Sequence, residues 1–225
     1  MQLTNEQKTI VNHTLGPALV YAVAGSGKTT AMTHRIARLV REGAFGAEKR
    51  LASSFCNANV NDIREKLKAW PECEKVNVCT LHHVGNTIIQ EAAKCGLILP
   101  PQALQDGENL PRNILSITLS KLWREKVSYH QELNHLDRDD FLRYIGSCKG
   151  NLQYASVDEA NLPAAARRIA SQAKAPSGLP WYLDLYREYE HVRLSRNEIT
   201  FEDMLMTGWE LLVRHSQLAD LFRGK

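Results

Sequence analysis

Short continuous runs of apolar residues mark the first part of the chain, with helical patterns between them. Runs of this kind, flanked by turn residues, are typical of strands buried in a parallel sheet. They cover residues 18–21, 51–55 and 76–81. After each run, apolar residues recur three or four positions apart, as on one face of a helix. Strands that alternate with helices in this way indicate an α/β fold, with a parallel sheet and helices on both of its faces.

The expected helices have recognisable ends. A short helix precedes the first run, where Thr4 or Asn5 can cap it and Gly16 ends it. The helices after the three runs are expected from the turn at Lys28, from about Asn59, and through Val84 to a stop at Gly96. Ligands of parallel sheets bind at the carboxyl ends of the strands, so we expect the turns after the three runs to converge there.

The pattern changes at Ile98. No clear strand follows it, and helical segments alternate with polar or proline-bearing joints. A long helix after Pro180 has an aromatic side that is expected to be core, and Thr200 is expected to cap the next helix. The pattern therefore predicts an α/β part over residues 1–97 and a mainly helical part after it.

Composition narrows the class of protein only a little. The chain has 225 residues, 44% of them hydrophobic, and a net charge of +3, which is compatible with a nucleic-acid partner without indicating one. Its five cysteines form no C-x-x-C pair, so neither a disulfide framework nor a zinc site is signalled. Because there is no signal peptide and no apolar run long enough to span a membrane, we expect a cytoplasmic protein without a membrane partner.

The turn after the first run carries the most specific chemistry. Its sequence, Ala22-Val23-Ala24-Gly25-Ser26-Gly27-Lys28-Thr29, resembles the phosphate-binding G-x-x-x-x-G-K-[ST] loop, with Ala22 in place of the first glycine. The glycines let backbone N–H groups face phosphate oxygens at a helix N-terminus. Lys28 can reach the β and γ phosphates, and the Thr29 hydroxyl can ligate Mg²⁺. The alternative is a glycine-rich turn that binds no ligand.

Four other residues have two interpretations each. Gln7 is either a solvated helix residue or, through its paired donor and acceptor, a reader of the adenine edge. Phe55 ends an apolar run and is either core or a stacking platform for bases. His82 and its neighbour His83 are either DNA contacts or residues that merely begin a helix.

Together these segments resemble the amino-terminal region of UvrD/Rep-type superfamily 1 DNA helicases. Residues 3–7 look like the family's Q motif and residues 22–29 like its motif I. Residues 54–57 are similar to its T-F-T-N motif Ia, residues 80–82 to its T-x-H motif, and residues 199–205 to its D-F-x-x-L-L helix. The ordered set covers nearly the whole chain and is weakest over 98–180.

The resemblance implies a P-loop NTPase with a RecA-like sheet, and ATP-driven 3′-to-5′ translocation on single-stranded DNA. It also implies that residues 1–97 are the first part of the RecA-like domain, that residues 98–195 are a helical insertion, and that residues 196–225 return toward that domain. It implies ATP and Mg²⁺ as cofactors, with Lys28 and Thr29 catalytic and Thr29 on the metal. Adenine would be read by Gln7. The nucleotide would be held by Ala24, Gly25, Ser26, Gly27, Lys28, Thr29 and Thr30. DNA, single-stranded or at a junction with duplex, would be contacted by Phe55, Asn57, Thr80 and His82.

Several family features are not found in the sequence. Ser54, Cys56 and Ala58 depart from the usual motif Ia, and Thr200 stands where the late helix usually has aspartate. No strand ending in Asp-Glu and no second RecA-like domain with arginine fingers is found, and such a finger can account for roughly 10³–10⁵ in rate. We therefore expect a truncated helicase, with the second domain elsewhere in the full-length chain and little hydrolysis by this part alone. The alternatives are a small P-loop phosphotransferase and a non-enzymatic nucleic-acid-binding module.

Overall fold

The computed structural model describes residues 3–14, 16–44, 46–102 and 109–223, which form two compact units. The first unit contains the described residues up to His83, together with Phe222 and Arg223. The second unit contains those from Val84 to Leu221. This division falls inside one helix and differs from the predicted boundary at residue 97. The three-part organisation, with its helical insertion, stays a prediction.

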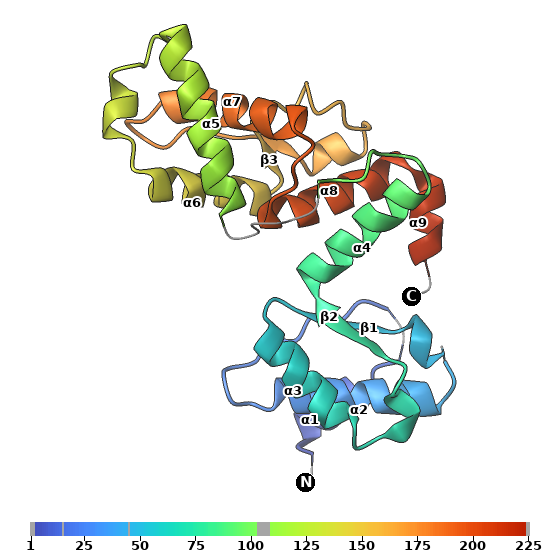
Figure 1. Cartoon of the computed structure of the whole chain (residues 1–225). Coiled ribbons are helices and arrows are strands. Elements are labelled where there is room, and N and C mark those ends of the chain that lie inside the picture. The colour runs from blue at the N-terminus through green and yellow to red at the C-terminus, as the bar shows by residue number, and fades with distance from the viewer. Residues whose placement is uncertain (1–2, 15, 45, 103–108, 224–225) are drawn as a thin grey trace. The chain divides into compact units, whose positions relative to one another are not determined.

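The first unit is a small α/β arrangement (Figure 1). Its helices and strands, in chain order, are α1 (Asn5–Asn12), α2 (Lys28–Arg41), η1 (Ala47–Lys49), β1 (Leu51–Ser54), α3 (Asn57–Leu67), η2 (Pro71–Cys73) and β2 (Asn77–Thr80). Strands β1 and β2 pair in parallel, with Leu51 opposite Asn77 and Ser54 opposite Thr80. The predicted parallel pairing is therefore confirmed for two of the three expected strands.

The expected strand at residues 18–21 is not formed. These residues have no regular secondary structure, and the side chains of Leu19 and Tyr21 are 78% and 88% exposed. A strand exists through hydrogen bonds to a neighbour, and β1 and β2 pair only with each other among the described residues. The apolar run has the composition of a buried strand. Among the described residues, however, no neighbouring strand pairs with it.

The core of the first unit lies between α2, α3 and the two strands. Ala37 of α2 packs with Val60 and Ile63 of α3 and with Ala52 and Val78 of the strands. The spacing of the apolar residues explains this core, because residues three or four apart share one face of a helix and alternate residues share one face of a strand. The predicted helices after 28 and near 59 are thus confirmed.

The second unit is mainly helical. Its elements are the main part of α4 (Leu81–Lys94), then α5 (Leu110–Glu125), η3 (Glu132–His135), α6 (Arg138–Gly150), β3 (Gln153–Tyr154), η4 (Ala166–Arg168), β4 (Ser171–Gln172), α7 (Trp181–Ser195), α8 (Phe201–Arg214) and α9 (Ser216–Phe222). Strands β3 and β4 form a short parallel pair that sequence reasoning missed. Two-residue strands leave no periodic pattern by which to find them.

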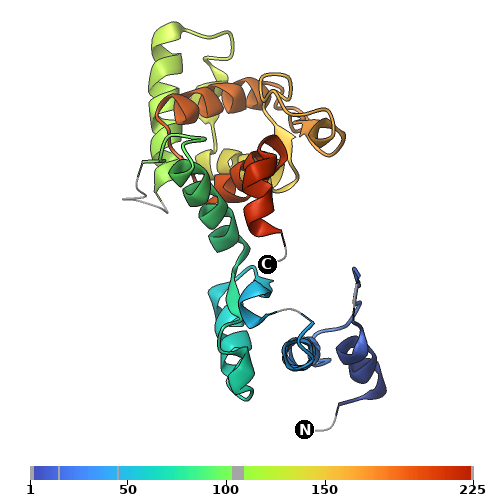
Figure 2. The same ribbon diagram turned by 90° about the vertical axis from the view of Figure 1, so that its right-hand side faces the viewer.

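Aromatic side chains fill the core of the second unit. Helix α7 lies beside α5 in both views (Figures 1 and 2) and buries the ring of Tyr186. The ring of Phe141 on α6 meets those of Tyr182 and Tyr189 edge-on, with centroids 5.2 and 6.5 Å apart. The aromatic side of the helix after Pro180 is therefore core, as predicted.

Candidate nucleotide and DNA sites

The loop at residues 22–29 has the backbone that phosphate binding requires. Gly25 and Gly27 have φ angles of 78° and 79°, in the left-handed region that only glycine adopts at little cost. Gly27 is the N-cap of the 14-residue helix α2. The first turn of α2 therefore presents N–H groups that no helical carbonyl can satisfy, together with the positive end of the helix dipole. This geometry fits an anionic phosphate chain.

Lys28 is bonded to the loop itself. Its Nζ donates to the carbonyl oxygens of Val23 at 2.6 Å and Ala22 at 3.0 Å. The side chain is exposed, so a ligand can reach the ammonium group. Thr29 and Thr30, the other predicted ligand residues after the glycines, lie half-buried in the first turn of α2.

Gln7 joins the first helix to the loop. The Thr4 hydroxyl accepts from the Gln7 main-chain N–H, and the Gln7 amide oxygen accepts from the Thr4 N–H at 3.0 Å, which completes a capping box. The Gln7 amide nitrogen donates to the Ser26 carbonyl at 3.0 Å. Gln7 is thus more than a solvated helix residue. Both ends of its amide have protein partners in this structure, and its role toward adenine stays a prediction.

Two arginines of α2 hold the end of α1, and sequence reasoning missed them. The Nε atoms of Arg35 and Arg38 donate to the carbonyls of His13 and Val11, at 3.1 and 2.7 Å. These carbonyls lie at the C-terminal end of α1, where carbonyl groups have no N–H donor within the helix. The signal available in the sequence was the spacing of the two arginines, which places them on one face of α2.

A cavity of about 800 Å³ lies between α1, the 18–23 segment and the start of α2. Its lining includes Gln7, Ser26, Lys28 and Arg35. Ligand pockets of small molecules span roughly 300–1,000 Å³, so the cavity is of suitable size. The cavity is lined both by Gln7, which is predicted to contact adenine, and by Ser26 and Lys28, which are predicted to hold the phosphates.

The second predicted site lies at the carboxyl ends of β1 and β2. The register places Ser54 beside Thr80, so the turns that follow the two strands, with Phe55 and His82, begin at the same edge. Phe55 is 76% exposed, which rules out the core interpretation of this side chain. Asn57, the first residue of α3, is also exposed.

Thr80 has a structural role in addition to its predicted one. Its hydroxyl accepts a hydrogen bond of 3.2 Å from the His83 main-chain N–H, in the first turn of α4. His82 lies half-buried in that turn. The structure brings Phe55 and Thr80 to one edge of the sheet. Among the described residues, no strand leads into the phosphate loop, so strand pairing does not place the loop at that edge.

The described residues contain neither a candidate membrane span nor a candidate metal cluster. No helix combines the length and the apolar composition that crossing a membrane would need. Within the same described ranges, no three or more His, Cys, Asp and Glu side chains gather in a way that could hold a metal ion.

The model of the UvrD/REP helicase N-terminal domain family matches residues 3–225, and the chain belongs to this family. It is 26% identical to a probable DNA helicase II homolog of Rickettsia conorii, over 99% of this chain and 32% of that protein. It is 27% identical to the ATP-dependent DNA helicase PcrA of Staphylococcus aureus, over 99% of this chain and 28% of that protein. The chain thus spans about a third of the length of these relatives. The family membership predicted from the motifs is confirmed.

Proposed function

We propose that this chain is the ATP-binding amino-terminal part of a DNA helicase with a RecA-like P-loop NTPase fold. The observation that carries the proposal is the left-handed pair Gly25 and Gly27 at the start of α2, beside an exposed Lys28. Membership of a helicase family and the names of the relatives support it. ATP is the expected nucleotide and Mg²⁺ the expected metal.

Each residue of the loop has a specific role in this proposal. The N–H groups of α2's first turn bind phosphate oxygens, and the Lys28 ammonium exchanges the Ala22 and Val23 carbonyls for the β and γ phosphates. The Thr29 hydroxyl ligates Mg²⁺. When bound, Mg²⁺ neutralises charge that develops during phosphoryl transfer. Gln7 binds adenine through its side-chain amide. This requires the amide to give up its hydrogen bond to the Ser26 carbonyl, or to bond to Ser26 and adenine at once.

The second part of the proposal is a single-stranded DNA site at the edge that follows β1 and β2. Phe55 provides an exposed aromatic face on which a base stacks, and Asn57, Thr80 and His82 supply polar groups. We infer movement in the 3′-to-5′ direction, and action at single-strand to duplex junctions, from the resemblance to UvrD/Rep-type helicases. A second RecA-like domain is expected to supply arginines for hydrolysis, so this chain alone should bind ATP and hydrolyse it slowly.

Calorimetric titration of the 225-residue chain with Mg·ATP tests the nucleotide site. Lys28→Ala should weaken binding at least about tenfold, because a charge-assisted contact to phosphate is lost. Lys49→Ala removes an exposed lysine of the same unit and should leave the affinity unchanged. Equal affinity of the wild type and Lys28→Ala would contradict the role given to the loop.

Fluorescence anisotropy with labelled oligothymidylate tests the DNA site. The chain should bind single-stranded DNA, and binding should weaken with added salt because phosphate contacts release counterions. In the longest chain available, single-stranded DNA should stimulate ATP hydrolysis. A rate that responds only to a small-molecule acceptor would instead support a phosphotransferase.

A further inference from the structure

Helix α1, which carries Gln7, has no buried residue to hold it in place. Its length is eight residues, and Ile10 and Val11 are only half-buried. Isolated helices shorter than about 12–15 residues are marginal in water, so a helix of this length depends on contacts with the rest of the protein. Polar contacts with α2 and with the phosphate loop therefore determine much of the position of α1.

Arg38 of α2 makes several of these polar contacts. Its Nε donates to the Val11 carbonyl at 2.7 Å, and its Nη2 donates to the His13 carbonyl at 3.2 Å. Its Nη1 donates to both carboxylate oxygens of Glu42, one turn further along α2, at 2.9 and 2.7 Å. All three nitrogens of the guanidinium thus have partners. Because the group is planar and its N–H directions are fixed, these bonds hold it in one orientation against the end of α1.

Arg35, one turn before Arg38, contacts the same end of α1. Its Nε donates to the His13 carbonyl at 3.1 Å, and its Nη2 lies 2.9 Å from Nδ1 of the His13 ring. A guanidinium can only donate, so the second contact requires an unprotonated Nδ1 that accepts. His13 is the C-cap of α1. The two arginines therefore fix the C-terminal end of this helix to α2.

Helix α2 thereby connects both parts of the proposed nucleotide site. Its first turn, from Lys28, follows the phosphate loop, and Arg35 and Arg38 lie further along the same helix. At the other end of α1, the Gln7 amide donates to the Ser26 carbonyl of the loop. Because a short helix is stiff, the bonds at the His13 end determine where the end that carries Gln7 lies.

The separation between Gln7 and the loop matters for binding. The base and the phosphates of a nucleotide are joined covalently, so contacts to both form together only where the protein groups are a suitable distance apart. In this structure that distance depends on α1, on α2 and on the arginines that connect them.

We propose that Arg35 and Arg38 are positioning residues for base selectivity. By fixing the end of α1, they hold Gln7 where it contacts adenine while the triphosphate occupies the loop. The proposal rests on the adenine role proposed for Gln7. Arg35 and His13 line the cavity, whereas Arg38 is not among the described residues that line it. Arg38 therefore acts without touching the nucleotide, and its variants test positioning alone.

Calorimetric titrations with Mg·ATP, Mg·GTP and Mg·tripolyphosphate test the proposal. Tripolyphosphate has no base, so it reports on the phosphate loop alone. The wild type should prefer ATP to GTP, because a glutamine amide matches the N6/N7 edge of adenine. Arg38→Gln should weaken ATP binding by about two- to tenfold, the effect of one hydrogen bond, and leave the other two affinities unchanged. Arg38→Lys keeps the charge without the planar group and should show the same loss.

Arg41→Gln is the matched control. It removes another arginine of α2, which pairs with Glu72 at 3.0 Å rather than with α1. This variant should bind all three compounds as the wild type does. A loss of ATP preference as large as that in Arg38→Gln would overturn the proposal, because the effect would then not depend on the end of α1.

A double variant links the arginine to Gln7. Gln7→Ala should lose the preference for ATP, and adding Arg38→Gln should cost no further ATP affinity, because both changes act on one contact. Fully additive losses would overturn the proposal, as would an equal loss of tripolyphosphate binding in both Arg38 variants. If the wild type prefers ATP and Arg38→Gln keeps that preference, the proposed function stands and the positioning role is wrong. If the wild type binds ATP and GTP equally, the adenine role of Gln7 fails, and the positioning role fails with it.

Discussion

The amide nitrogen of Gln7 donates a hydrogen bond of 3.0 Å to the main-chain carbonyl of Ser26, across nineteen positions of sequence. This bond connects the capping box of α1 to the phosphate loop. Helix α1 is also held at its other end by Arg35 and Arg38 of α2. The loop is therefore supported by α1, which is itself held by α2.

Gly27→Ala should damage the loop more than Gly25→Ala. Both glycines are left-handed, so each alanine costs roughly 1–2 kcal/mol of unfolding free energy. A Cβ at Gly27 would in addition push the Gln7 amide away from the Ser26 carbonyl, whereas a Cβ at Gly25 meets nothing within 4 Å. Urea unfolding gives the stabilities, and Mg·ATP titration should show the larger loss for Gly27→Ala. Identical behaviour of the two variants would mean that Gln7 does not support the loop.

Phe55→Ala should weaken single-stranded DNA binding without loss of nucleotide binding. A stacked base is worth roughly 1–3 kcal/mol, or about five- to 150-fold in affinity. Stability should change little, because the ring is 76% exposed. Phe201→Ala, which removes a ring that is 51% exposed and lies outside the predicted site, is the matched control. Anisotropy titrations compare the three proteins, and equal DNA affinities would leave Phe55 without the stacking role.

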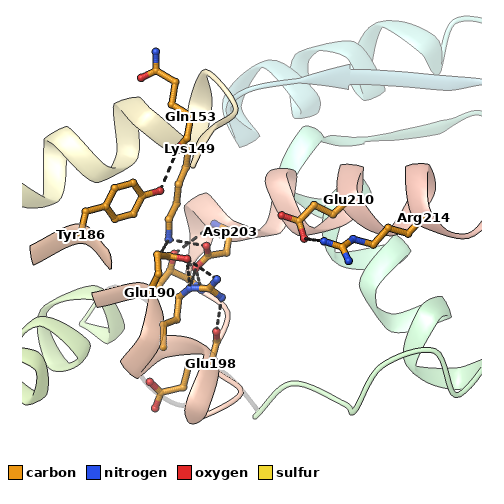
Figure 3. A network of polar contacts seen from close by, with 10 residues as sticks. Lys149, Gln153, Tyr186, Glu190, Glu198, Asp203, Glu210 and Arg214 are labelled. Atoms are coloured by element: carbon orange, nitrogen blue, oxygen red, sulfur yellow. Dashed lines mark hydrogen bonds and ion pairs between the residues drawn. The ribbon is translucent and has the colours of Figure 1, made fainter. Parts of the chain in front are cut away.

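Lys149→Met should destabilise the chain by about 3–5 kcal/mol, because it removes one partner from the buried ion cluster that Lys149 forms with Asp203 and Glu190 (Figure 3). The two carboxylates would then face one arginine. Lys94→Met is the control. Lys94 pairs with Glu91 on an exposed surface, where an ion pair is worth about 0–1 kcal/mol. Chemical denaturation measures both. A loss in Lys149→Met as small as that in Lys94→Met would show that the cluster does not anchor α8.

Asp203 should make the protein sensitive to acid. Burial alone would raise the pKa of this carboxyl, but the charges of Arg193 and Lys149 and the hydrogen bonds from Lys149 and Thr200 outweigh burial and lower it. The folded pKa therefore lies below the ordinary carboxyl value of 3.8. The stability that this difference contributes is complete above that value and is lost as pH falls through the folded pKa.

Unfolding free energies measured between about pH 6 and pH 2 test this expectation. The wild type should lose more stability over the acid range than Asp203→Asn, which has no proton to bind at this position. Because other carboxyls titrate in both proteins, the difference between the two curves isolates Asp203. Parallel curves would contradict the assignment.

The sequence predicted the local features of this protein well. The spacing of apolar residues located α2, α3 and α7, and the cap residues Thr4 and Thr200 begin helices as their hydroxyl groups suggest. The motifs also predicted the family. Glycines, a lysine and a threonine at fixed spacing indicate a phosphate-binding loop, whose conformation depends on only a few neighbouring residues.

Contacts between distant residues were decided only by the tertiary structure. Whether Phe55 is buried, whether residues 18–21 form a strand, and which carbonyls Arg38 contacts all depend on partners far away in sequence. Lys149 reads as an ordinary charged helix residue until Asp203, 54 positions later, is placed beside it. The local sequence pattern determines the hydrogen bonds within a helix and which of its faces is apolar. Burial, pairing and the packing of α1 on α2 arise when separate elements compete for the same space.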